Sequence, residues 1–301
     1  TAENSSTEVI VARGEKIPIN TVLNKRYKLF KDLATGAFGA TYLAEDSQKK
    51  PHHPQSVVLV KQLYPSNTNQ QYLELARRLF NNEAKFLERL GKHDRIPQFI
   101  AFFEENLQFF IVEEFIKGHS LSAEINQGKK LSAAQVTQII TDVLEVLIFV
   151  HDHQIIHRDI KPDNLIRREQ DQRIVLIDFG AIKQIQPQQL DNQTVSIGTI
   201  GYAPPEQVGG FPRFNSDIYA LGIIGIQALT DMNPREFHRE HHTGEIVLQN
   251  LSDASLQHWS KITAVSPELA VILDKMVHLD PDQRYQSATE VLKNIENLAH
   301  R

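Results

Sequence analysis

The hydrophobic pattern of this 301-residue sequence changes once, near Gly118. Before Gly118, five short runs of aromatic, β-branched and other apolar residues predict strands, and one helical repeat lies among them. After Gly118, apolar residues recur mostly at helical spacings, and only short strands near Leu165–Ile166 and Ile174–Ile177 are expected. The pattern therefore predicts a small β-rich lobe, a short connector and a larger, mainly helical lobe.

The same pattern places the boundaries of these parts. We expect an N-terminal extension over residues 1–24, a first lobe over 25–115 and a second lobe over 116–301. The expected strands are Tyr27–Leu33, Ala40–Glu45, Ser56–Val60, Phe99–Phe103 and Phe109–Phe115. The expected helices are 73–87, Ala133–His151, Ile218–Leu229, Pro267–Met276 and Ser287–Leu298. Clefts between two such lobes are a preferred place for ligands.

Composition excludes several classes of function. With 32 Lys and Arg against 37 Asp and Glu, the net charge is −5, which is unlike a general nucleic-acid binder or a polybasic membrane binder. The chain has no cysteine, which excludes disulfides, thiolate nucleophiles and cysteine-ligated metals. The uncharged, apolar stretch Ile218–Thr230 is shorter than the roughly 20 residues of a membrane span, so no membrane contact is expected within this chain. We expect a cytoplasmic location, and a start at Thr1 leaves open a cytoplasmic domain of a larger protein.

The strongest chemical signal is the segment His157–Asn164, which holds four charged side chains and an amide within eight residues. Apolar residues enclose it on both sides, which argues against a freely exposed charged loop. Phosphoryl transfer needs an acceptor for a hydroxyl proton, a cation near the transferred phosphate and an oxygen ligand for Mg²⁺. Asp159, Lys161 and Asn164 can supply these three groups in turn.

A second acidic signal lies at Asp178, which follows the apolar run Ile174–Ile177 and precedes the pair Phe179-Gly180. A carboxylate at the end of a buried strand, next to a glycine turn, suits a hard cation better than it suits packing. The segment therefore predicts a further oxygen ligand for Mg²⁺.

Two segments nearer the N-terminus suit phosphate binding. Small residues in Leu33–Thr41 allow backbone amides to approach anionic oxygens, although taken alone they are more typical of an ordinary hairpin turn. Lys61 ends an apolar strand, and such a lysine either extends to solvent or holds phosphate inside a cleft. The second role requires a carboxylate beside it, and Glu83 can supply one from the inward face of the following helix.

The ordered set of these segments resembles the eukaryotic-like Ser/Thr protein kinase family, with a bacterial type of sequence over Gly198–Gln207. The resemblance covers roughly Tyr27 to Leu298 and implies the bilobal protein-kinase fold of the α+β class. That fold has a small five-stranded antiparallel N-lobe with one main helix and a larger, mainly helical C-lobe. The resemblance also implies the activity, which is transfer of the γ-phosphoryl group of Mg²⁺-ATP to Ser or Thr hydroxyls of protein substrates. Such a kinase would also phosphorylate itself.

The resemblance also assigns roles to individual residues. Lys61 would bind the α- and β-phosphates and pair with Glu83. Asp159 would accept the hydroxyl proton, and Lys161 would steady the γ-phosphate. Thr199 would belong to the catalytic group. The residues implied to contact ATP are Leu33, Ala34, Thr35, Gly36, Ala37, Phe38, Gly39, Thr41, Lys61, Glu114 and Ile116, and the implied ligands of Mg²⁺ are Asn164 and Asp178. The implied structural residues are Asp217, which anchors the catalytic loop, and the pair Glu206 and Arg284.

Three residues depart from the family pattern. Ala34 stands where the first loop glycine is expected, and Leu59 replaces the small alanine usually packed against adenine. Glu113 falls at the position that guards the back of the pocket, where a carboxylate must be hydrated or paired. We hypothesise that Glu113 competes with Glu83 for Lys61 and favours an inactive arrangement. The alternative is that Glu113 meets only water or a backbone amide.

A regulatory role is expected for the segment between Asp178 and Glu206. Arg158, next to the catalytic aspartate, marks kinases whose activation segment is ordered by phosphate on a nearby hydroxyl. Thr194 and Ser196 are the candidate phosphosites, and a plain polar surface is the alternative for both.

Two rival functions stay open from the sequence. A pseudokinase or nucleotide-binding scaffold is suggested by the three departures, although the whole set of charged family residues is present. A small-molecule phosphotransferase is opposed by the segment Gly198–Glu206, which resembles the substrate-docking region of protein kinases. A kinase-domain dimer is also left open. The histidines of 238–242 are expected in a solvated connector, because their spacing does not match the His-Glu-x-x-His zinc pattern.

Overall fold

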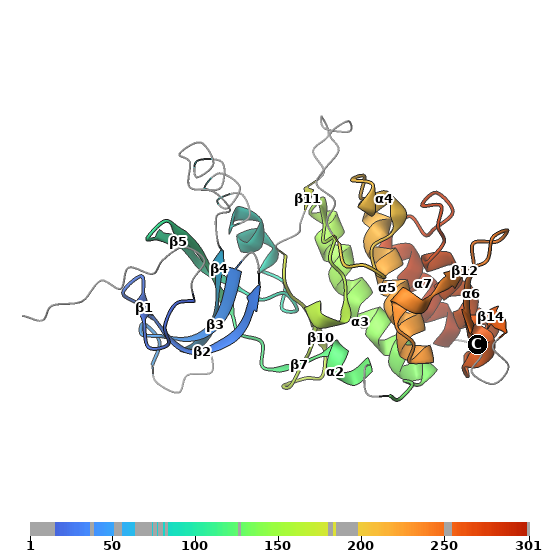
Figure 1. Cartoon of the computed structure of the whole chain (residues 1–301), viewed down its shortest axis with the longest axis horizontal. Coiled ribbons are helices and arrows are strands. Elements are labelled where there is room, and N and C mark those ends of the chain that lie inside the picture. The colour runs from blue at the N-terminus through green and yellow to red at the C-terminus, as the bar shows by residue number, and fades with distance from the viewer. Residues whose placement is uncertain are drawn as a thin grey trace, which may run out of the picture. The chain divides into compact units, whose positions relative to one another are not determined.

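The structure is a computed structural model that describes residues 16–36, 39–50, 56–63, 74, 77, 81, 84–125, 128–179, 183–184, 198–249 and 255–299. The chain divides into two compact units, Thr1–Phe115 and Ile116–Arg301. The first unit carries a large sheet, and the described part of the second unit is mainly helical (Figure 1).

One antiparallel sheet forms the centre of the first unit. Its strands are β1 (Val22–Leu23), β2 (Tyr27–Gly36), β3 (Gly39–Asp46), β4 (Val57–Leu63), β5 (Phe99–Glu105) and β6 (Gln108–Glu114). Their order in the sheet is β1-β2-β3-β4-β6-β5, and Figure 1 shows β2, β3 and β4 side by side. Every second residue of β4 is buried, which places Val58 and Val60 in the core and Lys61 on the opposite face. A helix over residues 84–90 follows β4 in the chain and ends before Gly91, three residues beyond the expected end at residue 87.

The α+β class is confirmed, but the sheet has six strands where the sequence predicted five. The added strand β1 comes from the expected N-terminal extension. Ile17 and Leu23 are only 4% and 3% exposed, because both pack into the apolar core on one face of the sheet. The Ile17 backbone N–H also donates to the Tyr42 hydroxyl over 3.0 Å, and that hydroxyl donates to Gln62 over 2.9 Å. Residues 16–24 are therefore part of the folded unit.

The β2–β3 hairpin depends on a glycine at its second strand. Gly36 stands opposite Gly39 in the register, so β2 and β3 pair antiparallel up to the residues on either side of 37–38. A Cβ atom on Gly39 would lie 2.1 Å from the backbone oxygen of Gln62 on β4, a separation that no side chain tolerates. Gly39 is therefore required by the close approach of β3 to β4.

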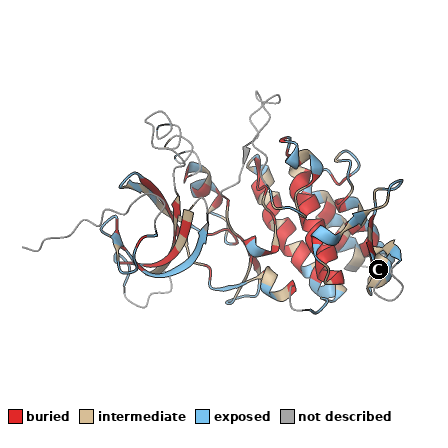
Figure 2. Ribbon diagram, in the orientation of Figure 1, coloured by how far each residue is buried: buried red, intermediate tan, exposed pale blue. Residues whose placement is uncertain are grey.

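Helices supply most of the second unit. They are α2 (Leu121–Ile125), α3 (Ala133–Asp152), α4 (Pro205–Val208), α5 (Phe214–Thr230), α6 (Pro267–Met276) and α7 (Ala288–Ala299). Ser132 and Gln135 form a capping box that starts α3, because each side chain accepts a hydrogen bond from the other residue's backbone N–H. The helix α3 packs against α5 and α7, and α5 is buried almost all round (Figure 2). Among the described helices, α3 alone is long and apolar enough to span a membrane, and half of that stretch is buried within the unit.

Short strands connect these helices, and some of them were not expected from the sequence. The strands are β7 (Gly118–Ser120), β8 (Ile155–Ile156), β9 (Leu165–Arg168), β10 (Ile174–Leu176), β11 (Lys183–Gln184), β12 (His238–Arg239), β13 (Ile246–Gln249) and β14 (Leu256–His258). The last three form an antiparallel sheet, which corrects the expectation that the short strands near Leu165–Ile166 and Ile174–Ile177 are the only ones after Gly118. This sheet is stabilised by burial of Ile246, Leu248 and the neighbouring Trp259, all fully excluded from solvent.

Candidate active site

A buried carboxylate fixes the backbone of the charged segment His157–Asn164. Asp217, in the first turn of α5, is 1% exposed and accepts the backbone N–H groups of His157 and Arg158, each over 2.9 Å. His151, at the end of α3, places its Nε2 atom 2.9 Å from the same carboxylate. The predicted anchoring role of Asp217 is confirmed. Because α3 and α5 belong to the helical core, the segment is held rigidly.

Three polar side chains, from Lys161, Asn164 and Thr199, converge on the carboxylate of Asp159. The Lys161 ammonium lies 2.7 Å from Oδ2, and the Asn164 amide nitrogen lies 3.0 Å from the same oxygen. The Thr199 hydroxyl donates to Oδ1 over 2.8 Å, and Lys161 also reaches that hydroxyl at 3.2 Å. Thr199 is 40 residues away in the sequence, so this cluster is made by the fold and not by local chain geometry. A carboxylate with these partners is fixed in orientation and stays partly accessible.

The buried imidazole of His157 contacts the backbone of Asp159 and helps to hold this cluster in place. Burial lowers its pKa below the ordinary 6.5, although the nearby carboxylates of Asp217, Asp178 and Asp159 act in the opposite direction. The ring is therefore neutral near pH 7. Its Nε2 donates to the Ile177 carbonyl over 3.2 Å, and its Nδ1 accepts the backbone N–H of Asp159 over 3.3 Å. One tautomer satisfies both contacts and holds the Asp159 backbone.

Asn164 and Asp178 have the donor atoms that a Mg²⁺ ion prefers. The Asn164 side-chain nitrogen donates to both the carbonyl and the carboxylate of Asp159, over 2.8 and 3.0 Å. Those two oxygens only accept hydrogen bonds, so the Asn164 amide oxygen must face the other way. The Ile177 backbone N–H donates to the backbone carbonyl of Asn164 over 3.0 Å. Asp178 is the next residue in the chain, so its backbone lies beside the same loop. An amide oxygen and a carboxylate on adjoining segments suit a hard cation.

The segment 198–206 joins this cluster to the core of the second unit. Gly198 has a backbone φ of 146°, and a Cβ atom there would lie 2.6 Å from side-chain atoms of Ala203 and Gln207. Glycine is therefore required immediately before Thr199. Burial raises the pKa of Tyr202 to about 12, which keeps its hydroxyl as a donor to Gln227 over 2.7 Å.

An ion pair fixes the end of that segment. The Arg284 guanidinium is fully buried and donates to both carboxylate oxygens of Glu206, over 2.6 and 2.9 Å. Burial raises the pKa of Glu206, but hydrogen bonds from Arg284 and Ser216 outweigh burial and hold the pKa below its ordinary 4.5. The pair predicted from the sequence is confirmed. It ties α4 to the start of α5 and to the chain before α7.

In the first unit, Lys61 forms an ion pair with Glu113. The Lys61 Nζ atom lies 3.0 Å from Glu113 Oε2, and these side chains are 19% and 5% exposed. The hypothesis that Glu113 engages Lys61 therefore has structural support, and the alternative of water or a backbone amide alone does not hold. Glu83, the other expected partner, lies outside the described residues.

The remaining residues predicted from the sequence are distributed over both units. The first unit contains Leu33, Ala34, Thr35, Gly36, Gly39, Thr41 and Glu114, in β2, β3 and β6. The second unit contains Ile116 and the cluster of Asp159, Lys161, Asn164, Asp178 and Thr199. Four further predicted residues lie outside the described part of the chain: Ala37, Phe38, Thr194 and Ser196.

Two positioning residues were missed from the sequence. Gln207 is 2% exposed, and its amide donates to the backbone oxygen of Arg158 over 2.6 Å. His151 continues the inward stripe of α3 one turn beyond Leu147, which is the signal that could have identified it. Gln207 has no comparable signal, because a polar residue after Glu206 suits a surface helix as well.

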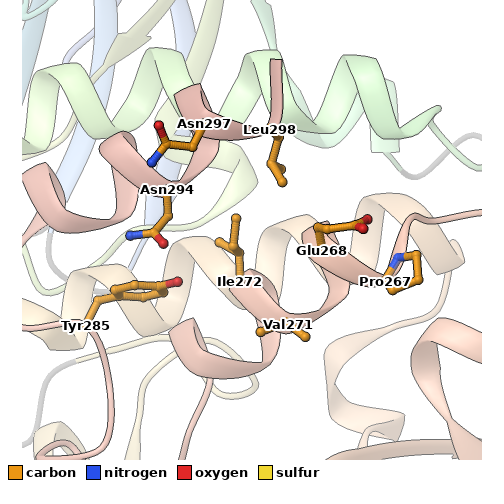
Figure 3. A pocket seen from close by; sticks show the side chains of 8 residues that line it. All are labelled: Pro267, Glu268, Val271, Ile272, Tyr285, Asn294, Asn297 and Leu298. Atoms are coloured by element: carbon orange, nitrogen blue, oxygen red, sulfur yellow. The ribbon is translucent and has the colours of Figure 1, made fainter. Parts of the chain in front are cut away.

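A separate groove in the second unit contains none of these residues. It has a volume of 380 Å³ and lies between α6 and α7 (Figure 3). Its lining residues are Pro267, Glu268, Val271, Ile272, Tyr285, Asn294, Asn297 and Leu298. Its lining has no cluster of titratable groups. The candidate catalytic residues are therefore those of the loop around Asp159.

Comparison with known proteins identifies the family. The sequence model of the protein kinase domain family matches residues 27–295 of this chain. The chain is 39% identical over 282 residues to serine/threonine-protein kinase PknA of Nostoc sp. PCC 7120, covering 91% of this chain and 48% of the relative. It is 38% identical over 282 residues to serine/threonine-protein kinase B of Synechocystis sp. PCC 6803, covering 91% and 47%. The chain spans about half the length of these curated relatives. The bilobal kinase fold is thus confirmed, and the chain belongs to the protein kinase domain family, as a kinase domain of the bacterial serine/threonine type.

Proposed function

We propose that this domain transfers the γ-phosphoryl group of Mg²⁺-ATP to Ser or Thr hydroxyls of protein substrates, and that it phosphorylates itself. Protein kinases in general use ATP and Mg²⁺. The observation that carries the proposal is the convergence of Lys161, Asn164 and Thr199 on the carboxylate of Asp159. The relatives named as serine/threonine kinases support the acceptor class.

The proton transfer falls to Asp159. Its carboxylate orients the substrate hydroxyl and accepts the hydroxyl proton as the oxygen attacks the γ-phosphorus and the bond to the departing ADP breaks, a role worth about 10²–10⁴-fold in rate. The Thr199 hydroxyl and the Asn164 amide fix the two carboxylate oxygens. The Lys161 ammonium, 2.7 Å from the same carboxylate, neutralises negative charge where the γ-phosphate is transferred.

Nucleotide binding is assigned to the β2–β3 hairpin, to Lys61 and to the chain around Glu114 and Ile116. Small residues of the hairpin let backbone N–H groups meet phosphate oxygens, and Lys61 binds the α- and β-phosphates. Asn164 and Asp178 are the residues that would hold Mg²⁺, which when bound neutralises charge on the phosphates. We also propose a cytoplasmic location, because the reaction consumes ATP.

A phosphate switch is proposed for the activation segment. The Arg158 guanidinium is buried, and this burial lowers its pKa despite the nearby Asp217 carboxylate. A poorly hydrated guanidinium is a strong partner for a phosphate group. We expect the double variant Thr194→Ala, Ser196→Ala to lose about tenfold in activity, the loss of one to two charge-assisted contacts. Peptide phosphorylation rates measure this, with the exposed Thr289→Ala as the matched control. The proposed phosphate switch is ruled out if the double variant keeps full activity while mass spectrometry shows no phosphate on it.

Label transfer tests the proposed function. The domain is incubated with γ-labelled ATP and a generic basic protein, with and without Mg²⁺, and the labelled amino acids are identified. We expect Mg²⁺-dependent label on Ser and Thr of the domain and of the basic protein. Binding of ATP without any transfer would instead make the domain a nucleotide-binding scaffold.

A further inference from the structure

A buried acidic side chain, Glu113, lies within the sheet of the first unit. The first six residues of β6 are all buried, and Glu113 is the last of them. Its direct neighbours across the sheet are Leu59 on β4 and Phe99 on β5, both apolar. A carboxylate in such surroundings is strongly unfavourable unless a cation or hydrogen-bond donors pair with it.

The geometry of the sheet brings Lys61 to this carboxylate. Leu59 stands opposite Glu113, and Lys61 follows Leu59 by two residues on the same face of β4. Glu113 and Lys61 are therefore diagonal neighbours on one face, and their charged atoms are 3.0 Å apart. The next carboxylate along the strand, Glu114, faces the other way and accepts the backbone N–H of Gln98 over 3.2 Å. The pairing with Lys61 is thus specific to one acidic residue of β6.

We propose that Glu113 is a positioning residue that restrains Lys61 and lowers the affinity of this kinase domain for the phosphate groups of ATP. The inference rests on the proposed function, in which Lys61 binds the α- and β-phosphates. A phosphate that approaches Lys61 meets an ammonium already neutralised by a carboxylate 3.0 Å away. The carboxylate also repels the phosphate, and this repulsion is strong because both side chains are largely shielded from water.

The effect acts on charge and therefore distinguishes nucleotides from nucleosides. Adenosine carries no phosphate, so its binding does not compete with Glu113 for Lys61. ATP carries three phosphates and must share the ammonium with the carboxylate. A change in the shape of the pocket would alter both ligands together, whereas release of Lys61 alters ATP alone. This difference separates the proposed role from simple packing by Glu113.

The test removes the negative charge of Glu113 while keeping the shape of its side chain. Glu113→Gln is compared with the unaltered domain by isothermal titration with Mg²⁺-ATP and, separately, with adenosine. We expect Mg²⁺-ATP to bind about tenfold more tightly to the variant, which corresponds to relief of a modest part of the repulsion between close charges. Adenosine affinity should change by less than about twofold, since its binding involves no charge. In steady-state kinetics, KM for ATP should fall while kcat changes less.

Three more variants complete the test. Glu45→Gln removes an exposed carboxylate from β3 of the same sheet and should leave ATP affinity unchanged. Glu113→Asp keeps the negative charge, so its affinity for ATP should stay close to that of the unaltered domain and below that of Glu113→Gln. Glu113→Met removes the charge with an apolar side chain and should bind ATP more tightly, which keeps the test valid if the glutamine variant folds poorly.

The outcomes separate the inference from the proposed function. Tighter ATP binding with unchanged adenosine binding supports the role of Glu113. Equal changes for both ligands, or weaker ATP binding by Glu113→Gln and Glu113→Met, overturn it while leaving the kinase activity in place. If the unaltered domain binds neither ligand, the proposed function fails and the inference fails with it.

Discussion

Replacing Asp217 by asparagine is expected to lower the unfolding free energy by about 3 kcal/mol and kcat by about a hundredfold. The carboxylate accepts two backbone N–H groups of the catalytic loop and lies within hydrogen-bond distance of His151. Asparagine has one acceptor oxygen, so its amide nitrogen must face at least one of these donors. The loop then loses a buried contact next to Asp159, and a displacement of about 1 Å at a catalytic group is enough for this loss of rate.

The measurement for Asp217→Asn combines urea unfolding with peptide phosphorylation kinetics. The matched control is Asp152→Asn, which removes an exposed carboxylate at the end of α3 and should change neither quantity. If Asp217→Asn keeps both its stability and its kcat, the anchoring of the loop by α5 is not what orients Asp159.

Replacing Arg284 by methionine is expected to lower the unfolding free energy by about 3–5 kcal/mol. The substitution leaves the Glu206 carboxylate without its bidentate partner and frees three backbone carbonyls that the guanidinium also contacts, those of His278, Leu279 and Asn215. The double variant Glu206→Met, Arg284→Met removes the unpaired charge as well. It should be more stable than Arg284→Met alone, because the penalty of a lone charge disappears.

The pH dependence of this pair has a definite sign. The pKa of Glu206 is held below 4.5 in the folded chain, chiefly because hydrogen bonds from Arg284 and Ser216 outweigh the opposing effect of burial. The pair therefore contributes stability above pH 4.5, and that contribution is lost as the pH falls through the depressed folded pKa. The difference in unfolding free energy between the unaltered domain and Arg284→Met should accordingly shrink in acid. A constant difference from pH 7 down to acid unfolding would show that Glu206 does not titrate with the pair.

Local sequence was sufficient for the long helices α3, α5, α6 and α7 and for the charged residues of the catalytic loop. The capping box at Ser132 and the apolar repeat of α3 are local signals, and α6 was predicted with its observed bounds. The charges of His157–Asn164 are likewise continuous in the sequence. Three-dimensional contacts were needed for the rest, since Thr199 reaches Asp159 across 40 residues and His151 reaches Asp217 across 66.

The missed elements have physical reasons. The strand β1 has only two residues and depends on pairing with β2, so periodicity alone does not reveal it. The sheet β12–β14 is formed from two- to four-residue strands, which are too short for a clear alternating pattern. Glu113 was identified as a departure, but its pairing with Lys61 depends on the register of β4 against β6. A one-residue slip would place Glu113 on the opposite face.

The most direct test of the account is the single-turnover rate of phosphoryl transfer by Asp159→Asn. Saturating Mg²⁺-ATP and a Ser-containing peptide are used, and ATP binding is measured on the same protein. Asparagine keeps the size of the side chain but cannot accept the hydroxyl proton, so we predict a loss of about a thousandfold with ATP binding retained. The control Asp163→Asn neutralises an exposed carboxylate of the same loop and should stay within about threefold of the unaltered rate. Transfer by Asp159→Asn at nearly the unaltered rate would contradict the central role of this carboxylate.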